Sequence, residues 1–192
     1  DLQAALVVGS NLRKDHPLFA QRIRQATKKG CQVFALNAKV YDWAMPVAAS
    51  VVAAQDWAQA LADVAAAVAN AKGVQSPVAG QANAEAQAIA DALMAGERKA
   101  VLLGNAAAHH AQAAQLLALA NWIGAQTGAT VGYLTEAANT VGAQWVKAQP
   151  QANGLNAAQM IAGGLKAAIL LNNEPVFDSA AGQQALQGLN KS

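Results

Sequence analysis

The sequence predicts an α/β fold: a doubly wound, mostly parallel sheet of about five or six strands, with helices on both faces. Short apolar segments alternate with longer segments of helical periodicity along the 192 residues, without a regular repeat. Alanine supplies much of the 54% hydrophobic content, which suits helices packed closely on a sheet. Three of the apolar segments end in glycine or asparagine, which favour the turn from a strand into a helix.

The first predicted unit is strand, helix, strand. The apolar run at 6–8 is expected to be a buried parallel strand, and CQVFALN at 31–37 is expected to be the next. Pro17 suits the first turn of the helix between them, with Asp15 or His16 as its cap. One face of this helix is predicted to be buried, at Phe19, Ile23 and Ala26.

The rest of the chain continues this alternation. Further strands are predicted at 47–54, 99–105 and 165–175, and a loop followed by a short strand is predicted at 127–134. Helices are expected after Asp56 as cap, over 81–95, and from the end of the 99–105 segment to about Gln126. The buried stripe of the first of these helices is predicted to be Trp57, Leu61, Val64 and Val68.

The 192 residues are expected to form a single α/β domain, with the loop at 72–82 as a candidate internal boundary. The chain starts at Asp1 and no signal-like segment follows, so it is expected to be a fragment of a longer subunit. No apolar run approaches the ~20 residues that a membrane span needs.

Charge and cysteine content limit the classes of function. A net charge of +2 does not favour a nucleic-acid or membrane partner, although six of the 13 Lys and Arg residues lie between Arg13 and Lys29 and predict a locally basic face. Cys31 is the single cysteine, which excludes an internal disulfide and a cysteine-only metal or iron–sulfur site. Cys31 itself is predicted to be a small buried hydrophobic residue.

The candidate binding residues lie where predicted strands end. In an open parallel sheet, ligands bind beyond the carboxyl ends of the strands. The candidates are Gly9, Ser10 and Asn11 after the first strand, and Gly104 and Asn105 after the strand at 99–105; Asn172 and Asn173 form a third such turn. Glycine admits close backbone approach and asparagine offers an amide, yet ordinary strand-to-helix turns use the same residues.

Catalytic and metal-ligating motifs are not found. Gly9 is the only glycine of its turn, so the dinucleotide fingerprint G-x-G-x-x-G is missing, and G-x-x-x-x-G-K-[ST] does not occur. Ser10 lacks the G-x-S-x-G elbow. His109 and His110 are adjacent, so on a helix their side chains diverge by about 100°, and a solvated helix start is predicted. No catalytic or metal residues are therefore expected.

Two long segments resemble a known family. The first is VVGSNLRKDHPLFAQRIRQATKKGCQVFALN at 7–37, and the second, VLLGNAAAHHAQAAQLLALANWIGAQTGATVGYLTEAANTVGA, lies at 101–143. Both are similar to the large iron–sulfur subunit of the bacterial NADH-quinone oxidoreductases (respiratory complex I), whose C-terminal region resembles molybdopterin oxidoreductases such as formate dehydrogenases. The resemblance covers most of the chain, and 72–82 is its weakest part.

The resemblance implies a domain of the molybdopterin oxidoreductase type in which the family turn G-S-N-P…H-P matches at Gly9, Ser10, Asn11, His16 and Pro17. Leu12 replaces the proline of that turn. The second strand ends in Asn37-Ala38-Lys39, where active enzymes have an aspartate followed closely by an arginine that read guanine. Lysine does not reproduce the planar fork of arginine. The five candidate residues are therefore expected to be vestigial, with molybdopterin lost.

The resemblance also implies a wider setting. The whole complex passes electrons from NADH through FMN and iron–sulfur clusters to quinone, and the clusters belong to parts of the large subunit outside this chain. The chain is expected to be a structural domain without cofactor that contacts other peripheral-arm subunits on the cytoplasmic side of the bacterial inner membrane.

Two alternative functions remain open. The chain also fits a cofactor-binding fragment of an active molybdopterin oxidoreductase, or a nucleotide-binding regulatory module. Any exposed tryptophan would be a candidate contact anchor, among Trp43, Trp57, Trp122 and Trp145.

Overall fold

The fold is a parallel sheet covered on both faces, seen in a computed structural model that describes residues 2–137 and 139–191. Within these residues five strands form one sheet in the order β3-β2-β1-β4-β5, and all four pairings are parallel. The strands are β1 (Ala4–Val8), β2 (Gln32–Asn37), β3 (Ala48–Val51), β4 (Lys99–Leu103) and β5 (Thr130–Tyr133). The prediction of a doubly wound sheet is confirmed.

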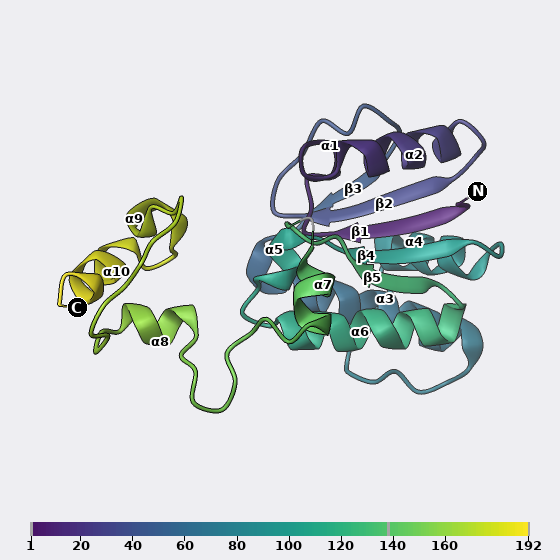
Figure 1. Cartoon of the computed structure of the whole chain (residues 1–192). Helices are drawn as coiled ribbons and strands as arrows, with labels where there is room; N and C mark the ends of the chain where they lie inside the picture. Colours follow the sequence, from purple (N-terminus) through teal and green to yellow (C-terminus); the bar gives the residue numbers. More distant parts are fainter. Residues whose placement is uncertain (1, 138, 192) are drawn as a thin grey trace. The chain divides into compact units, whose positions relative to one another are not determined.

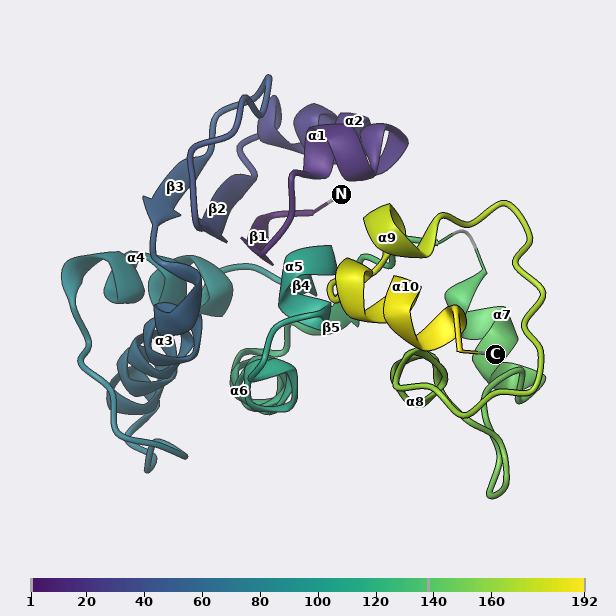
Figure 2. The same ribbon diagram turned by 90° about the vertical axis from the view of Figure 1, so that its left-hand side faces the viewer.

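The helices divide between the two faces of the sheet. Figure 1 shows α1 (Leu12–Asp15) and α2 (Pro17–Thr27) on one side and α3 (Trp57–Lys72), α4 (Ala84–Met94) and α6 (Ala113–Thr127) on the other. Figure 2, turned by 90°, shows the same division. The short helices η1 (Ala54–Asp56) and α5 (Asn105–Ala108) precede α3 and α6.

Two apolar cores follow from the alternation of side chains along the strands. In β1, Leu6 and Val8 belong to the core beneath α3, α4 and α6, whereas Val7 belongs to the core beneath α2. β1 is buried along its whole length because it is the central strand of the sheet. The predicted buried stripe of α3 is confirmed at Trp57, Leu61, Val64 and Val68.

Two end groups do not act as the sequence predicted. His16 precedes α2 and Asp56 precedes α3, but neither side chain accepts a capping hydrogen bond. Asp15, the other predicted cap, instead accepts hydrogen bonds from Ser10 and Asn11. Phe19 was predicted to lie on the buried face of α2 and is exposed, because the apolar face of this helix is set by Ala20, Ile23 and Ala26.

The long helix predicted to run to about Gln126 is broken into α5 and α6. The break covers His109–Gln112. The imidazole Nε2 of His110 hydrogen-bonds to the Ala54 carbonyl at 2.9 Å, and the backbone N–H of Gln112 donates to Nδ1 of His110 at 3.0 Å. These side-chain hydrogen bonds take the place of backbone hydrogen bonds of a continuous helix, and the periodicity of a sequence does not predict them.

Contacts divide the chain into two compact units, Asp1–Ala138 and Asn139–Ser192. The loop at 72–82 lies inside the first unit and does not separate the two. Whether the chain behaves as one domain stays a prediction. The second unit holds α7 (Thr140–Trp145), α8 (Ala157–Ile161), α9 (Pro175–Asp178) and α10 (Gly182–Leu189).

The strand predicted at 165–175 is not formed. The segment is irregular, and Ile169 and Leu171 are 97% and 89% exposed. An extended segment becomes a strand only when a neighbouring strand takes up its N–H and C=O groups, and no described residue does so here. Only Ala185 and Gly188 are buried among the described residues of this unit. The unit therefore has almost no core of its own.

The four tryptophans differ in exposure, and this selects one of the predicted contact anchors. Trp43 and Trp57 are buried and Trp122 is partly buried, whereas Trp145 is 83% exposed. Among the described residues, no helix is long and apolar enough to cross a membrane.

The cap of α4 gives a first expected result. Asn83 precedes this helix, and its Oδ1 accepts the backbone N–H of Ala86 at 2.9 Å. Asn83→Ala leaves that donor without its partner, so urea unfolding is expected to show a loss of about 1 kcal/mol in the free energy of unfolding. Asn70→Ala, inside α3, is the matched control and is expected to be neutral or slightly stabilising. Equal losses in the two variants would contradict the capping role.

Candidate functional site

The predicted site residues follow the carboxyl ends of β1 and β4, two neighbouring strands in the middle of the sheet. β1 and β4 are neighbours, with Val8 opposite Leu103, and the chain leaves them toward opposite faces of the sheet. This is the topological switch point, where ligands bind in open α/β sheets. The two turns that carry all five predicted residues adjoin at this point: Gly9, Ser10 and Asn11 in one, Gly104 and Asn105 in the other.

The two turns contact each other directly. The backbone N–H of Gly104 donates to the Val8 carbonyl at 2.8 Å, and that of Ala106 donates to the Gly9 carbonyl at 3.0 Å. A Cβ on Gly104 would lie 2.4 Å from Cβ of Ser10 and 2.5 Å from the Gly9 oxygen. Gly104 is therefore required by the close approach of the turns, and its lack of a side chain leaves no free space for a ligand.

Gly9 is required for two reasons. Its φ of 65° is in the left-handed region, which glycine adopts without strain. A Cβ at this position would lie 2.6 Å from the backbone nitrogen of Ala107 and 2.9 Å from Cζ3 of Trp57. In a nucleotide site, such a glycine lets the phosphate approach the backbone; here Ala107 of α5 and the Trp57 indole lie on the side where its Cβ would point.

The donors of the first turn are taken by an internal carboxylate. Ser10 is buried and its hydroxyl donates to Oδ2 of Asp15 at 3.2 Å. The backbone N–H of Asn11 donates to the same oxygen at 2.9 Å. Asp15 thus occupies the position that a bound anion would take at these donors, and its negative charge opposes a second anion there.

The sequence did not identify Trp57 and His110 as a pair that closes the switch point. Their rings stack, with centroids 5.6 Å apart and planes 26° apart, and Nε1–H of Trp57 donates to the Val52 carbonyl at 3.0 Å. Nε2 of His110 must carry the proton, because it faces the Ala54 carbonyl while Nδ1 accepts from Gln112. His110 is therefore partly buried and structural, not a solvated helix start. No local pattern signals this pair.

The end of β2 is also engaged within the chain. Asn37 is buried, and its carbonyl accepts the backbone N–H of Val52 at 3.0 Å. The ammonium of Lys39 lies over the Tyr41 ring, 5.5 Å from its centre. Lys39 thus has an aromatic partner of its own at the place where guanine would be read.

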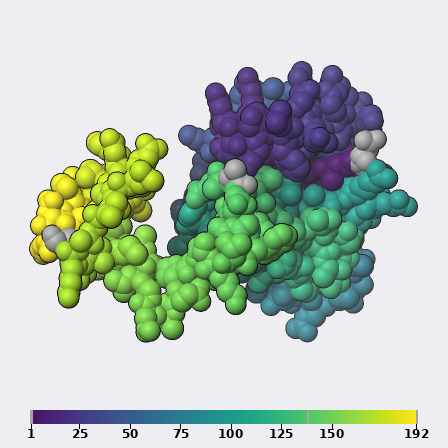
Figure 3. All heavy atoms as spheres, in the orientation of Figure 1, coloured from purple at the N-terminus to yellow at the C-terminus, as the bar shows by residue number. Residues whose placement is uncertain are grey.

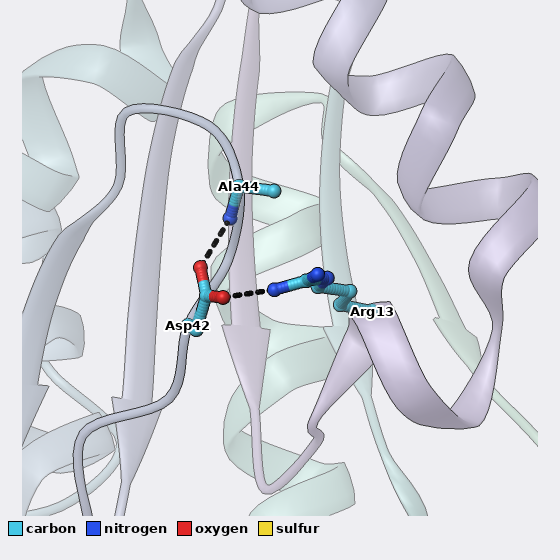
Figure 4. A network of polar contacts seen from close by, with 3 residues as sticks. All are labelled: Arg13, Asp42 and Ala44. Atoms are coloured by element: carbon cyan, nitrogen blue, oxygen red, sulfur yellow. Dashed lines mark hydrogen bonds and ion pairs between the residues drawn. The ribbon is translucent and has the colours of Figure 1, made fainter.

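Arg13, the first cation after the first turn, is held by the loop that follows β2. Its guanidinium pairs with the carboxylate of Asp42. The other carboxylate oxygen of Asp42 accepts the backbone N–H of Ala44 at 3.1 Å, where the backbone φ is 53° (Figure 4). The arginine nearest to the first turn is therefore paired with an internal carboxylate.

These residues fit a molybdopterin dinucleotide poorly. A pyrophosphate needs free backbone N–H donors and nearby cations. At the first turn the Asn11 N–H is bonded to Asp15, α1 is only four residues long, and Arg13 is paired with Asp42. The side-chain amides of Asn11 and Asn105 are half-buried, and two amides do not replace the positive charge that a pyrophosphate needs.

A cavity of about 220 Å³ lies beside the strand ends, between β2, β3, α3 and α4. None of the five predicted residues lines it. Asp56, Asp63 and Glu85 do, and Oε2 of Glu85 accepts the hydroxyl of Ser50 at 2.9 Å. The negative lining opposes a phosphate.

The remaining candidate residues of the sequence are the two histidines and the third turn, which lie outside the two turns at the switch point. Across residues 2–137 and 139–191, no group of three His, Cys, Asp or Glu side chains is arranged to hold a metal ion. His109 instead forms a surface contact with Glu136, at 3.1 Å. The Asn172–Asn173 turn lies in the second unit, and Asn172 has the left-handed φ of 52° that asparagine tolerates.

Cys31 is buried, as predicted, and burial raises the pKa of its thiol above the ordinary value of 9.0. The folded protein therefore holds this proton more tightly than the unfolded chain does. The contribution of the protonated thiol to the free energy of unfolding is complete below pH 9, and it falls as the pH rises above 9. Urea midpoints between pH 7 and pH 10 are expected to fall more for the wild type than for Cys31→Ala. Parallel falls would contradict this linkage.

Similarity to known proteins extends over nearly the whole chain. The family model for molybdopterin oxidoreductases matches residues 2–192. No curated protein matches the chain.

Proposed function

Because the chain belongs to the molybdopterin oxidoreductase family, we propose that it is a degenerate member: a structural domain of the large iron–sulfur subunit of a bacterial NADH-quinone oxidoreductase. The observation that carries this proposal is the Asp15 carboxylate, which takes the Ser10 and Asn11 donors that a cofactor phosphate would need. The close packing beside Gly9 supports it, because a Cβ at this position would meet the Ala107 nitrogen and the Trp57 ring.

In this proposal the chain carries no redox chemistry. The whole complex moves electrons from NADH through FMN and iron–sulfur clusters to quinone, and the clusters are bound by other parts of the large subunit. The chain supplies a folded surface for other peripheral-arm subunits, on the cytoplasmic side of the bacterial inner membrane. The long segments at 7–37 and 101–143, which are similar to this iron–sulfur subunit, support the assignment within the family.

The test uses the full-length subunit. We expect it to co-purify with the flavin-bearing subunit of the peripheral arm, and we expect elemental analysis to find no stoichiometric molybdenum or tungsten. Failure of the full-length subunit to associate with any peripheral-arm subunit would overturn the assignment to complex I.

The second candidate is a cofactor-binding fragment of an active molybdopterin oxidoreductase such as a formate dehydrogenase. The family match over residues 2–192 favours it as well. About one molybdenum or tungsten atom per full-length chain would establish this candidate and overturn the structural role.

A plain nucleotide-binding module is tested by thermal shift with GDP and ATP. A ligand at 100 times its Kd stabilises a protein by ~2.7 kcal/mol, so a true site gives a clear shift. We expect none, because the first turn offers its donors to Asp15.

A further inference from the structure

The surface of α1 and α2 carries a local excess of positive charge. Residues 12–29 contain six Lys or Arg residues against one acidic residue, Asp15, whereas the whole chain has a net charge of only +2. Figure 3 shows these first residues, in purple, as one continuous region on the surface of the first unit. We call it the basic face; its cations are Arg13, Lys14, Arg22, Arg24, Lys28 and Lys29.

The chain leaves most of this charge without acidic partners. Asp15 is held by Ser10 and Asn11, and Asp42 is held by Arg13 and Ala44. Among the described residues, no acidic group forms an ion pair with Lys14, Arg22, Arg24 or Lys28. A surface with this excess of positive charge attracts an acidic one over a distance of about one Debye length, ~8 Å in physiological salt.

Apolar side chains lie among these cations. Leu18 is 83% exposed in the first turn of α2, and Phe19 beside it is 39% exposed. Exposed apolar groups ringed by charge are typical of the centre and rim of a protein interface. The remaining apolar face of α2 is buried against the sheet, at Ala20, Ile23 and Ala26, so α2 has too little free apolar area to lie in a membrane.

A cavity of about 230 Å³ opens on the basic face. Arg13, Gln21 and Arg24 line one part of it, and Trp43 and Ala44 line another. Nε1–H of Trp43 is buried and has no acceptor among the described residues. That N–H is closed to solvent and Arg13 is paired with Asp42, so Arg24 is the cation that a carboxylate in this cavity would meet.

We propose that the basic face is the docking site for an acidic segment of a partner protein, with a carboxylate of that segment in the cavity beside Arg24 and an apolar side chain against Leu18. This inference rests on the proposed function, in that the partner is another subunit of the same assembly. The association is steered by charge and therefore weakens with added salt.

The experiment measures association of the full-length subunit with the purified peripheral-arm subunits. Arg22→Glu/Arg24→Glu is expected to raise the Kd by about tenfold or more, mainly through a slower association rate. Arg98→Glu/Lys166→Glu makes the same charge change at exposed positions outside the basic face and is expected to stay within about twofold of the wild type. Leu18→Ser is expected to speed dissociation severalfold.

The possible results separate the inference from the proposed function. If the wild type associates and Arg22→Glu/Arg24→Glu associates equally well, the docking site is wrong while the proposed function stands. If the wild type associates with no peripheral-arm subunit, the proposed function itself fails. Arg22→Gln/Arg24→Gln removes the charges without adding acidic groups, and it must show the same direction of change with an unaltered circular dichroism spectrum.

Two further probes distinguish other sources of negative charge. Sodium phosphate is expected to show no saturable binding by calorimetry; binding that is lost in Arg24→Gln would assign the cavity to a small free anion instead. Vesicles containing phosphatidylserine are expected not to sediment the protein. Sedimentation of the wild type but not of Arg22→Glu/Arg24→Glu would replace the acidic protein segment by a membrane surface.

Discussion

Gly9→Ala is expected to lower the free energy of unfolding by about 2–5 kcal/mol. The left-handed φ of 65° costs a residue with a side chain about 1–2 kcal/mol. The new Cβ also lies 2.6 Å from the Ala107 nitrogen and 2.9 Å from the Trp57 ring, and such overpacking costs about 1–3 kcal/mol. Urea unfolding followed by circular dichroism measures the total.

Gly73→Ala separates these two contributions. Gly73 ends α3 with a φ of 64°, nearly that of Gly9, and nothing lies within 4 Å of the Cβ that an alanine would add. The free energy of unfolding of Gly73→Ala is therefore expected to fall only by the cost of the left-handed backbone, about 1–2 kcal/mol. Equal losses for the two variants would mean that Ala107 and Trp57 move aside without cost, and the crevice would then be adaptable rather than filled.

The parts of the fold that were predicted correctly depend on local sequence. β1 and β4 are buried on both faces, so β1 and the part of β4 after Lys99 are continuous apolar runs, and the glycine after each strand marks its end. The buried stripe of α3 repeats at helical spacing. The strand-end rule for parallel sheets then placed Gly9–Asn11 and Gly104–Asn105 at one edge without any knowledge of strand order.

The parts that were not predicted depend on contacts between distant residues or on a missing neighbour. Trp57 and His110 are far apart in the sequence, and only the folded chain brings their rings together and breaks the helix after α5. The apolar run at 165–175 has the composition of a strand, but no described residue supplies a ladder for it. The composition of a segment indicates whether it can be buried, whereas the tertiary structure decides whether a neighbouring strand is present to pair with it.

Asp15 differs from its predicted capping role for a related reason. An acidic residue just before Pro17 is a reasonable cap for the helix that begins there. In the fold α1 turns this carboxylate back to Ser10 and Asn11, five and four residues earlier. A turn that resembles a phosphate site from its sequence thus has its anion supplied by the next turn of the chain.

Trp57→Ala is expected to have the largest effect, a loss of about 3–5 kcal/mol in the free energy of unfolding. The indole is buried, stacks on His110, lies 2.9 Å from where a Cβ of residue 9 would be and donates to the Val52 carbonyl. Its removal leaves a cavity between α3 and the two turns. Urea unfolding measures the loss, with the retained tryptophans as fluorescence probes.

Trp57→Phe and a double variant test whether this side chain fills the crevice. Trp57→Phe keeps a ring but leaves the Val52 carbonyl without its donor, so a smaller loss of about 1–3 kcal/mol is expected. In Trp57→Ala/Gly9→Ala the added Cβ no longer meets the indole at 2.9 Å. The double variant should therefore lose about 0.5–3 kcal/mol less than the sum of the single losses. Strict additivity would show that the indole does not clash with a Cβ at position 9, and would contradict the close packing of Trp57 against this turn.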